Sequence, residues 1–329
     1  MNTPNLRTFE ALLEEQDHSF LKKKISAILR RNPRALRPDL LQIRDAITIE
    51  RARYYLRRLI KGLTEVKTGR TNDLNLNRWK QYNDIITDSL WIVEKRDRSG
   101  NHSGGYWGNF VPQIPHQLLR RFTKPGEWVL DPFLGSGTTL IECGRLNRNG
   151  IGIELQPSVA ARTRRAIAPR SAGPSSRRIV VTGDSTAVDY KKELAAAGIP
   201  SVQFVLVHPP YWDIIRFSSK RSDLSNAPSL PVFLERFGSV IRRCSGVLDR
   251  GRHLAVVIGD KYRAGEWIPL GFYAMEEVLK SGFTLKSIVV KNFNQTRGKR
   301  NQEELWRYRA LHGGFYVFKH EYLFLFQKR

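Results

Sequence analysis

The sequence predicts an α/β protein with a doubly wound, mostly parallel sheet, an antiparallel last strand and an N-terminal helical basic module. Three observations predict it. After about residue 101, short apolar runs alternate with helix-like stretches, as in parallel strands covered by helices on both faces. The last two runs follow each other without a long helical pattern between them. The first hundred residues show mixed three- and four-residue apolar spacing and an excess of cations instead.

Residues 1–100 are therefore predicted to form a separate helical module, and residues 101–329 the α/β domain. Between Phe20 and Arg70, fifteen lysines and arginines oppose four acids. Pro33 and Pro38 divide the helical pattern into at least two pieces. The module presents either a solvated basic face or a surface for nucleic-acid phosphates, and the charge of the whole chain favours the second interpretation.

Composition limits the class of protein. The 329 residues carry a formal net charge of +24, which indicates a polyanionic partner such as nucleic acid. Two cysteines cannot form a disulfide scaffold or, by themselves, a zinc site, and we expect no metal. No run of about 20 apolar residues and no secretion signal is evident. We therefore expect a soluble cytoplasmic protein without a membrane partner.

The predicted strands of the α/β domain are apolar runs that end in turn residues. They are 128–131, 151–155, 179–181, 204–208, 254–259, 287–291 and 322–327. Helices are predicted between them at 138–146, 157–167, 231–248 and 269–280. The alternation of the two sets defines the doubly wound sheet.

A glycine-rich turn follows the first of these strands. The strand ends at Asp131, the chain turns through Gly135 and Gly137, and a helix begins at Thr138. Glycines let a backbone approach a ligand closely, and the first turn of a helix offers unpaired N–H groups. No Gly-Lys-Ser/Thr follows, so the turn is not a P-loop.

Two acids lie at the ends of the next two strands. Glu154 ends the second strand, where a carboxylate can accept hydrogen bonds from both hydroxyls of a ribose. Asp184 follows the third strand, where an acid can reach the edge of an adenine. The order of the glycine turn and the two acids predicts an adenosine-containing cofactor at this edge of the sheet.

The segment Asp131-Pro-Phe-Leu-Gly-Ser-Gly-Thr-Thr139 resembles motif I of the DNA amino-methyltransferases. The resemblance implies a Rossmann-like methyltransferase sheet and S-adenosylmethionine as cofactor. Residues 108–118 look like the family's motif X, and 320–322 like its closing stretch. The cofactor-binding residues that the resemblance implies are Asn109, Phe110, Asp131, Phe133, Gly135, Ser136, Gly137, Thr138, Glu154 and Asp184.

The fourth predicted strand runs into His208-Pro209-Pro210-Tyr211. Two prolines fix an extended backbone whose carbonyls no helix consumes. Rigid hydrogen-bond acceptors suit the methylation of an aromatic amine, because they localise a lone pair that is otherwise delocalised into the ring. Tyr211, with Trp212 as a second candidate, is placed to stack on a base that has left the duplex. The predicted catalytic residues are His208, Pro209, Pro210 and Tyr211.

The tetrapeptide resembles motif IV of the same family, in which Asp, Asn or Ser usually precedes Pro-Pro-Tyr. Histidine at this position is a departure, but a neutral His208 accepts one hydrogen bond through its unprotonated nitrogen. No cysteine follows the prolines, which excludes the covalent route to cytosine C5. We expect direct in-line transfer of the methyl group without a covalent enzyme intermediate.

The C-terminal third adds candidates for nucleic-acid contact. Residues 291–300 and 306–309 combine cations, amides and aromatic rings, which read base edges and neutralise phosphates. Asp260, after the fifth strand, is expected to cap the next helix. The predicted nucleic-acid-binding residues are Trp212, Asn294, Arg297, Lys299, Arg300 and Arg307.

The expected function is site-specific methylation of double-stranded DNA at an exocyclic amine of a flipped base, with cytosine N4 slightly favoured over adenine N6. A restriction endonuclease is a candidate partner. Two alternatives stay open: an RNA base N-methyltransferase, and a catalytically weak nucleic-acid-binding protein that keeps the fold. A methyl-transfer assay with duplex DNA and with RNA distinguishes the DNA methyltransferase from the RNA methyltransferase. A measurement of cofactor binding distinguishes it from the nucleic-acid-binding protein.

Overall fold

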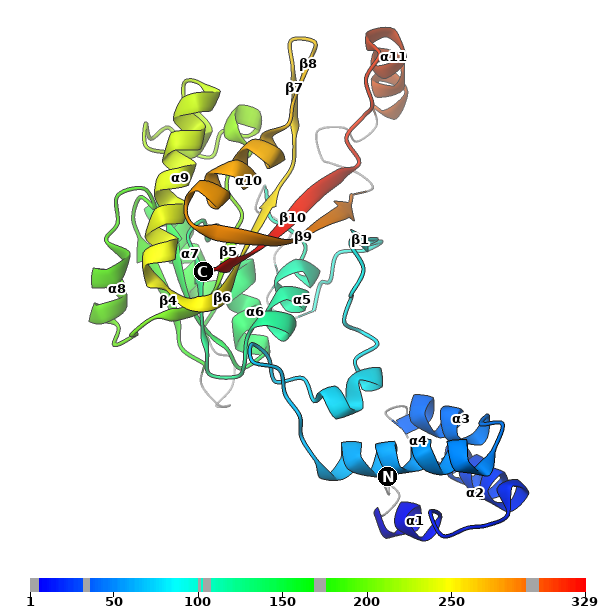
Figure 1. Cartoon of the computed structure of the whole chain (residues 1–329). Helices are drawn as coiled ribbons and strands as arrows, with labels where there is room; N and C mark the ends of the chain where they lie inside the picture. Colours follow the sequence, from blue (N-terminus) through cyan, green and yellow to red (C-terminus); the bar gives the residue numbers. More distant parts are fainter. Residues whose placement is uncertain (1–5, 32–35, 100–101, 103–107, 169–175, 294–301) are drawn as a thin grey trace. The chain divides into compact units, whose positions relative to one another are not determined.

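The computed structural model describes residues 6–31, 36–99, 102, 108–168, 176–293 and 302–329. The chain divides into two compact units, Met1–Ile86 and Thr87–Arg329 (Figure 1). The boundary differs from the predicted one at residue 100. Strand β1 (Leu90–Trp91) pairs in parallel with β9 (Phe283–Asn292), so the segment after Ile86 belongs to the sheet unit. A two-residue strand is too short to show a periodic pattern.

The N-terminal unit is helical and has its own core. Its helices are α1 (Leu6–Ala11), α2 (His18–Arg31), α3 (Arg37–Arg44) and α4 (Ile49–Thr64), followed by the 3-10 helix η2 (Leu76–Gln81). Buried apolar residues from all four α-helices, including Phe9, Ile25, Leu40 and Leu56, form one cluster. The apolar spacing in the sequence produces this cluster because residues three and four apart share a helix face.

Within the described residues, eight strands form one mixed sheet in the order β1-β9-β10-β6-β5-β2-β3-β4. The remaining strands of this sheet are β2 (Trp128–Asp131), β3 (Asn149–Glu154), β4 (Arg178–Thr182), β5 (Val202–Val207), β6 (Leu248–Ile258) and β10 (His320–Lys328). The pairs β4–β3, β3–β2, β2–β5 and β5–β6 are parallel. Strand β10 runs antiparallel to both β6 and β9. The predicted fold class is confirmed, including its antiparallel last strand.

Helices cover both faces of this sheet. They are α5 (Gln113–Phe122), α6 (Thr138–Arg145), α7 (Pro157–Ala166), α8 (Tyr190–Ala196), α9 (Leu230–Val247) and α10 (Leu270–Lys280). Apolar residues of α8, α9 and α10 join the strands in the largest core cluster, and α6 and α7 pack in another. In β4, Val180 belongs to the α6–α7 cluster, whereas Ile179 and Val181 pack against the other one. This alternation is the period-two pattern of a strand between two layers.

Several elements were not predicted. These elements are α8, α11 (Glu303–Gly313) and the hairpin of β7 (Lys261–Arg263) and β8 (Glu266–Ile268). The loop at 213–228 contains two short 3-10 helices, η3 (Trp212–Ile214) and η4 (Leu224–Asn226). Asp260 accepts a hydrogen bond from the N–H of Gly271 at 2.9 Å, so it caps α10 as expected. Among the described residues, no helix is long and apolar enough to span a bilayer.

Candidate active site

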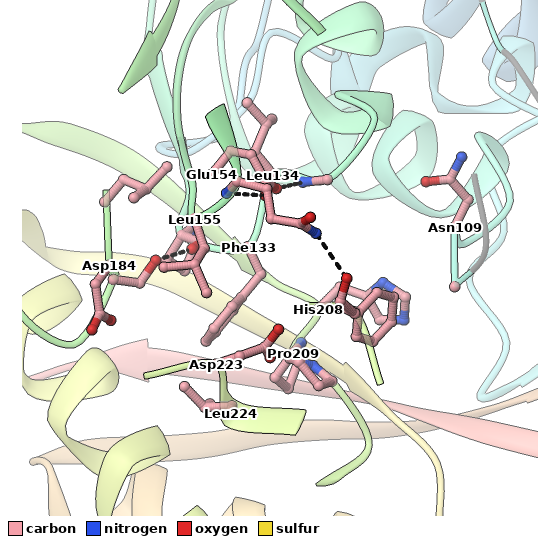
Figure 2. A pocket seen from close by; sticks show the side chains of 18 of the residues that line it. Asn109, Phe133, Leu134, Glu154, Leu155, Asp184, His208, Pro209, Asp223 and Leu224 are labelled. Carbon is pink, nitrogen blue, oxygen red and sulfur yellow. Dashed lines mark hydrogen bonds between the residues drawn. The ribbon is translucent and has the colours of Figure 1, made fainter. Parts of the chain in front are cut away.

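A cleft lies at the carboxyl ends of the parallel strands (Figure 2). Loops after β2, β3, β4 and β5 meet there, because parallel strands end at the same edge of a sheet. The segment before α5 completes the wall. Ten predicted site residues line the cleft: Asn109, Phe110, Phe133, Gly135, Thr138, Glu154, Asp184, His208, Pro209 and Pro210. Asp131, Ser136, Gly137 and Tyr211 are not among its lining residues.

Asp131 shapes the glycine loop and does not line the cleft, which corrects its predicted role in cofactor contact. Its carboxylate accepts hydrogen bonds from the N–H of Phe133 at 3.0 Å and the hydroxyl of Thr139 at 2.6 Å. Burial raises the pKa of Asp131 to about 6, although both hydrogen bonds lower it. The carboxylate therefore ties the end of β2 to the first turn of α6.

Gly135 and Gly137 of the glycine loop have different structural roles. Gly135 lines the cleft, donates its N–H to Glu154 at 3.0 Å and accepts a bond from the Thr163 hydroxyl at 2.7 Å. Gly137 is the N-cap of α6 with φ of 84°, and an added Cβ would lie 2.6 Å from Cγ2 of Thr163. Close packing of α6 on α7 therefore excludes a side chain at 137.

Ser136 acts through a neighbouring residue and does not contact the cleft directly. Its hydroxyl donates to the side-chain oxygen of Asn109 at 2.6 Å. This bond connects the glycine loop to the segment before α5. Both predicted cofactor residues thus belong to one wall, with only Asn109 exposed to the cleft.

Glu154 is the main acid of the cleft. One carboxylate oxygen accepts the N–H of Gly135 at 3.0 Å and the other accepts that of Gln156 at 2.8 Å. A carboxylate has about four lone-pair positions, so two remain for a ligand. Burial raises the pKa of Glu154 to about 7, against the lowering effect of the two backbone bonds. The residue is thus ready to accept two hydroxyl hydrogens.

Asp184 lies at another wall of the cleft (Figure 2). Its Oδ1 accepts bonds from both the N–H and the hydroxyl of Thr186, each at 2.8 Å. Its Oδ2 has no hydrogen-bond partner among the described residues. This oxygen is the acceptor available for a ligand amine, which suits the edge of an adenine.

The His208-Pro209-Pro210 segment lines the cleft directly after β5. Phe110 meets the His208 ring edge to face, with ring centroids 4.8 Å apart. Burial lowers the pKa of His208 to about 4, so the ring is neutral at pH 7. A neutral imidazole has one donor and one acceptor nitrogen, and its neighbours decide which is which.

Tyr211 and two distant residues decide the tautomer of His208. The Tyr211 hydroxyl donates to Oε2 of Glu321 at 2.9 Å, and Lys291 donates to Oε1 of the same carboxylate at 2.9 Å. Burial raises the pKa of Tyr211 well above its ordinary range, so the hydroxyl keeps its single proton. Nε2 of His208, 3.2 Å from that hydroxyl, must therefore be the donor. Nδ1 is left as an unprotonated acceptor.

Three polar residues of the cleft were not predicted from the sequence. Gln156 donates its side-chain amide to the carbonyl of Phe217 at 3.0 Å, which connects the end of β3 to the 213–228 loop. Asp223 is buried and accepts bonds from the hydroxyls of Ser218 and Ser225. Ser185 donates to the carbonyl of Pro132. The polar composition of that loop gave no signal for a buried acid.

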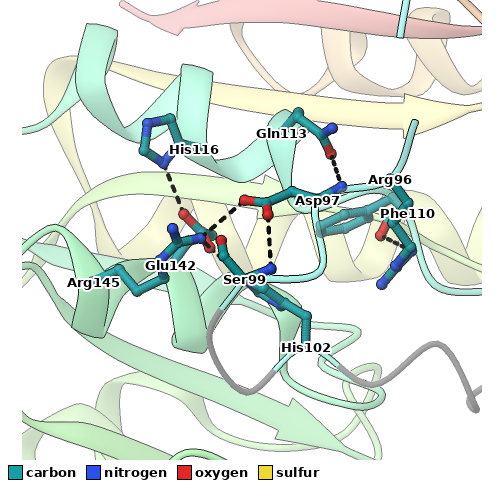
Figure 3. Close-up of polar contacts among 9 residues, drawn as sticks. All are labelled: Arg96, Asp97, Ser99, His102, Phe110, Gln113, His116, Glu142 and Arg145. Carbon is teal, nitrogen blue, oxygen red and sulfur yellow. Dashed lines mark hydrogen bonds and ion pairs between the residues drawn. The ribbon is translucent and has the colours of Figure 1, made fainter. Parts of the chain in front are cut away.

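A buried carboxylate positions the wall that contains Asn109 and Phe110 (Figure 3). Glu142 of α6 is fully buried and contacts His102 at 2.6 Å and His116 of α5 at 2.8 Å. Arg145 donates to the same carboxylate at 2.7 Å. Burial raises the pKa of Glu142, but these hydrogen bonds outweigh it and lower the pKa to about 2.

Arg96 completes this arrangement. It donates to the carbonyl of Phe110 at 2.9 Å, and Gln113 accepts the N–H of Asp97 at 3.2 Å. Because Arg145 of α6 also pairs with Asp97 at 3.2 Å, the segment before α5 is held against the helix that carries Glu142. The ring of Phe110 that touches His208 is thus fixed by contacts on the other side of the wall.

The predicted nucleic-acid residues separate into three groups. Trp212 is buried in the core, and its indole donates to the carbonyl of Ala227 at 2.9 Å. Stacking on a base is therefore excluded for Trp212 in this conformation, which corrects the prediction. Arg307 is exposed on α11. Asn294, Arg297, Lys299 and Arg300 lie outside the described residues.

Other chemistries lack support in the described part of the chain. No group of three or more His, Cys, Asp or Glu residues there is arranged to hold a metal ion. Cys143 and Cys244 are buried, and burial raises the pKa of both thiols. Neither is a lining residue of the cleft.

Comparison with known proteins gives local matches. Type II methyltransferase M.MjaII of Methanocaldococcus jannaschii is 44% identical over 68 residues, 20% of this chain and 13% of that protein. Type II methyltransferase M.XycI of Xanthomonas campestris pv. cyanopsidis is 39% identical over 69 residues, 21% of this chain and 22% of the relative. The chain thus matches less than a quarter of either relative's own length.

Among solved structures, TrmN from Thermus thermophilus aligns with 68% of this chain and 50% of that chain, at 19% identity and a TM-score of 0.43. Residues 42–164 match the N6_N4_Mtase family model, described as DNA methylase. The matched region includes the glycine loop and Glu154. With the named relatives, this match supports the predicted resemblance to the N4/N6 DNA amino-methyltransferases and S-adenosylmethionine as the cofactor.

Proposed function

We propose that the protein transfers a methyl group from S-adenosylmethionine to an exocyclic amine of a flipped base in double-stranded DNA, with cytosine N4 ahead of adenine N6. One observation carries the proposal. Glu154 lines the same cleft as His208 and Pro209, so a cofactor pocket and a rigid set of acceptors share one space.

The residues of the cleft suit this cofactor. Glu154 keeps two lone-pair positions for the ribose hydroxyls, and Asp184 keeps Oδ2 for the adenine amine. The glycine loop allows close approach of the methionine part at Gly135. When bound, S-adenosylmethionine supplies an electrophilic methyl group attached to a sulfonium.

The protein's own residues prepare the nucleophile. An aromatic amine is weakly nucleophilic because its lone pair is delocalised into the ring. Nδ1 of His208 and the carbonyl of Pro209 are the proposed acceptors for its two N–H groups, which favours tetrahedral nitrogen and frees the lone pair. Nδ1 can also take the proton that the methylated nitrogen loses. Catalysis then depends on alignment, with reacting atoms about 3–3.5 Å apart.

Tyr211 is a positioning residue in this proposal. Its hydroxyl, held by Glu321, keeps the proton of His208 on Nε2 and leaves Nδ1 unprotonated. The expected stacking of Tyr211 on the base is not part of the proposal, because an added Cβ at Gly259 would lie 3.0 Å from Cε2 of its ring, and the hydroxyl is already bonded to Glu321.

The relatives are named Type II methyltransferases, which favours a modification role beside a restriction endonuclease. We include such a partner in the proposal. It is tested by whether DNA modified in cells that express the protein resists cleavage at the modified sequence.

The activity itself is tested by mass spectrometry of nucleosides. Purified protein is incubated with plasmid DNA and S-adenosylmethionine that carries a labelled methyl group. Labelled N4-methylcytosine is the expected product. N6-methyladenine would overturn the choice of base, and C5-methylcytosine would overturn the mechanism. Label in RNA but not in DNA, or cofactor binding without transfer, would favour one of the two alternatives above.

A further inference from the structure

The N-terminal unit contains two helices joined by a short turn. Helix α3 ends at Arg44 and α4 begins at Ile49, with residues 45–48 between them. Thr48 caps α4 by accepting the N–H of Arg51 at 3.2 Å. A turn of three or four residues is the connection found in helix-turn-helix motifs, in which the second helix enters a DNA groove.

Helix α4 has one buried and one open face. Ala52, Leu56 and Leu59 pack in the core of the unit and are at most 4% exposed. The opposite face carries Glu50, Tyr54, Arg57 and Lys61, at steps of four, three and four residues, and all four are exposed. An open face on a helix anchored this firmly is available to a partner.

Some cations of α4 stabilise the N-terminal unit, and others point outward to solvent. Arg58 is directed inward, where it donates to Gln42 at 2.6 Å and lies 4.0 Å from Asp39. Arg57 has no ion pair or hydrogen bond among the described residues, and Lys61 has only the exposed pair with Glu65 at 3.5 Å. The outward charges are therefore not used to stabilise the unit.

A hairpin-like loop follows α4. Leu76 donates its N–H to the carbonyl of Lys67 at 2.7 Å, and Thr68 bridges Asn75 in antiparallel fashion. The side chains of Asn75 and Asn77 both donate to the carbonyl of Glu65 at 3.3 Å, which fixes the loop to the end of the helix. Its cations, Lys67 and Arg70, are exposed.

We propose that this unit is a second DNA-binding site, in which α4 lies in the major groove of duplex DNA. Tyr54 and Arg57 face the base edges, while Lys61, Lys67 and Arg70 contact phosphates. The major groove of B-form DNA, about 12 Å wide, admits an α-helix. Glu50, the acid of this face, can accept a hydrogen bond from a cytosine amine. The site is separate from the methyl-transfer cleft and does not depend on the proposed activity.

Duplex RNA is the competing occupant. The deep, narrow major groove of A-form RNA does not admit a helix, so the geometry of α4 favours DNA. The experiment therefore uses both nucleic acids. A 30-base-pair mixed-sequence DNA duplex carries a fluorescent label, and an RNA duplex of the same sequence competes for the protein.

Fluorescence anisotropy of the full chain measures the dissociation constant across a range of salt concentrations, without cofactor. The test variant is Arg57→Gln with Lys61→Gln. The matched control is Lys191→Gln with Lys192→Gln, which removes two exposed cations from α8 in the other unit. Thermal unfolding of all three proteins checks that they fold.

We expect the α4 variant to bind DNA about tenfold more weakly, because it loses the base contact of Arg57 and the phosphate contact of Lys61. The slope of log Kd against log salt should fall by about 0.9, since Lys61 is the one proposed phosphate contact among the two residues. The control should keep the wild-type slope. Equal losses in both variants, or preferential competition by RNA, would overturn the proposal. Tyr54→Ala provides an independent test, because it should reduce discrimination between DNA sequences without changing the salt slope.

Because binding is measured without methyl transfer, the two proposals can fail separately. A protein that binds DNA through α4 but never methylates it would refute the proposed function only. If the variant that lacks the charges of Arg57 and Lys61 methylates DNA normally and binds it with unchanged affinity, the second site alone is refuted.

Discussion

His208 replaces the oxygen-bearing side chain that usually precedes Pro-Pro-Tyr with a ring nitrogen. An imidazole serves as an acceptor only when it is neutral and when the correct nitrogen is unprotonated. Burial secures the first condition by lowering the pKa to about 4. The bonds from His208 through Tyr211 to Glu321 secure the second. The departure from the family pattern is therefore compatible with catalysis.

We predict that His208→Ala lowers the methylation rate on the order of 100-fold at saturating DNA, because one preorganised group for the transition state is lost. His208→Asn should keep part of the rate, since an amide oxygen also accepts. In the wild type, protonation of Nδ1 removes the acceptor, so the rate should be constant from pH 8 to 6 and fall as the pH approaches about 4. Single-turnover kinetics measure both effects.

His312→Ala, at an exposed histidine of α11 outside the cleft, is the matched control and should leave this rate unchanged. An unaltered rate in His208→Ala would remove His208 from the proposed mechanism. A wild-type rate that already falls between pH 7 and 6 would contradict the neutral, buried ring.

The pKa of Glu154 shifts in the opposite direction from that of His208, so its pH dependence lies closer to neutral pH. Its pKa is raised to about 7, and the ionised form is the better acceptor for two ribose hydroxyls. Affinity for S-adenosylmethionine should therefore increase by up to about tenfold from pH 6 to pH 8, as the ionised fraction rises. Calorimetry in buffers of different ionisation enthalpy should show proton release on binding near pH 7.

Glu154→Gln tests the cause of this dependence. The amide should bind the cofactor more weakly and with little change in affinity between pH 6 and 8. A pH dependence that persists unchanged in this variant would assign it to another group, of which Asp131, with a pKa of about 6, is the nearest in pKa.

At the scale of elements, the join between β2 and α6 depends on glycine. Both Gly137 and Gly126 have positive φ, of 84° and 80°, but only Gly137 has a neighbour in the space of a Cβ. Gly126→Ala should therefore cost about 1–2 kcal/mol from backbone strain alone. Gly137→Ala should cost a further 1–3 kcal/mol or so from the clash with Thr163, and should weaken cofactor binding.

Urea unfolding of the two variants separates strain from the clash. Their difference isolates the steric contribution, because the backbone conformations are alike. Equal losses of stability would show that α7 moves away to accept the methyl group, and the close packing of α6 on α7 would then not explain the glycine.

The elements predicted correctly are those whose signal is local. Continuous apolar runs identified the strands from β2 to β6, and the glycine turn identified the start of α6. The hairpin of β7 and β8 was not predicted because its strands are three residues each. Helix α11 has no buried residue among those described, so it shows no apolar stripe to detect.

The candidate site was predictable only where neighbouring residues carry the chemistry. The loop at 131–138, Glu154, Asp184 and the Pro-Pro segment could each be read from the chain. The partner that fixes the His208 tautomer could not, because Glu321 lies 110 residues from Tyr211. Trp212 was misassigned because the contact that buries it, a hydrogen bond from its indole to the carbonyl of Ala227, is made to a loop residue fifteen positions away.

At the scale of the whole molecule, the charge of +24 predicts how substrate affinity responds to salt. Each phosphate contact releases condensed counterions, so raising salt from 50 to 200 mM should increase the KM for DNA by at least about tenfold. The cofactor carries little net charge and binds in a cleft lined by acids, so its KM should change far less. The rate at saturating DNA should also stay constant, because the chemical step depends on buried groups that salt screens weakly. Steady-state kinetics at both salt concentrations measure all three quantities. A KM for DNA that is insensitive to salt would show that the excess of cations serves some purpose other than holding this substrate.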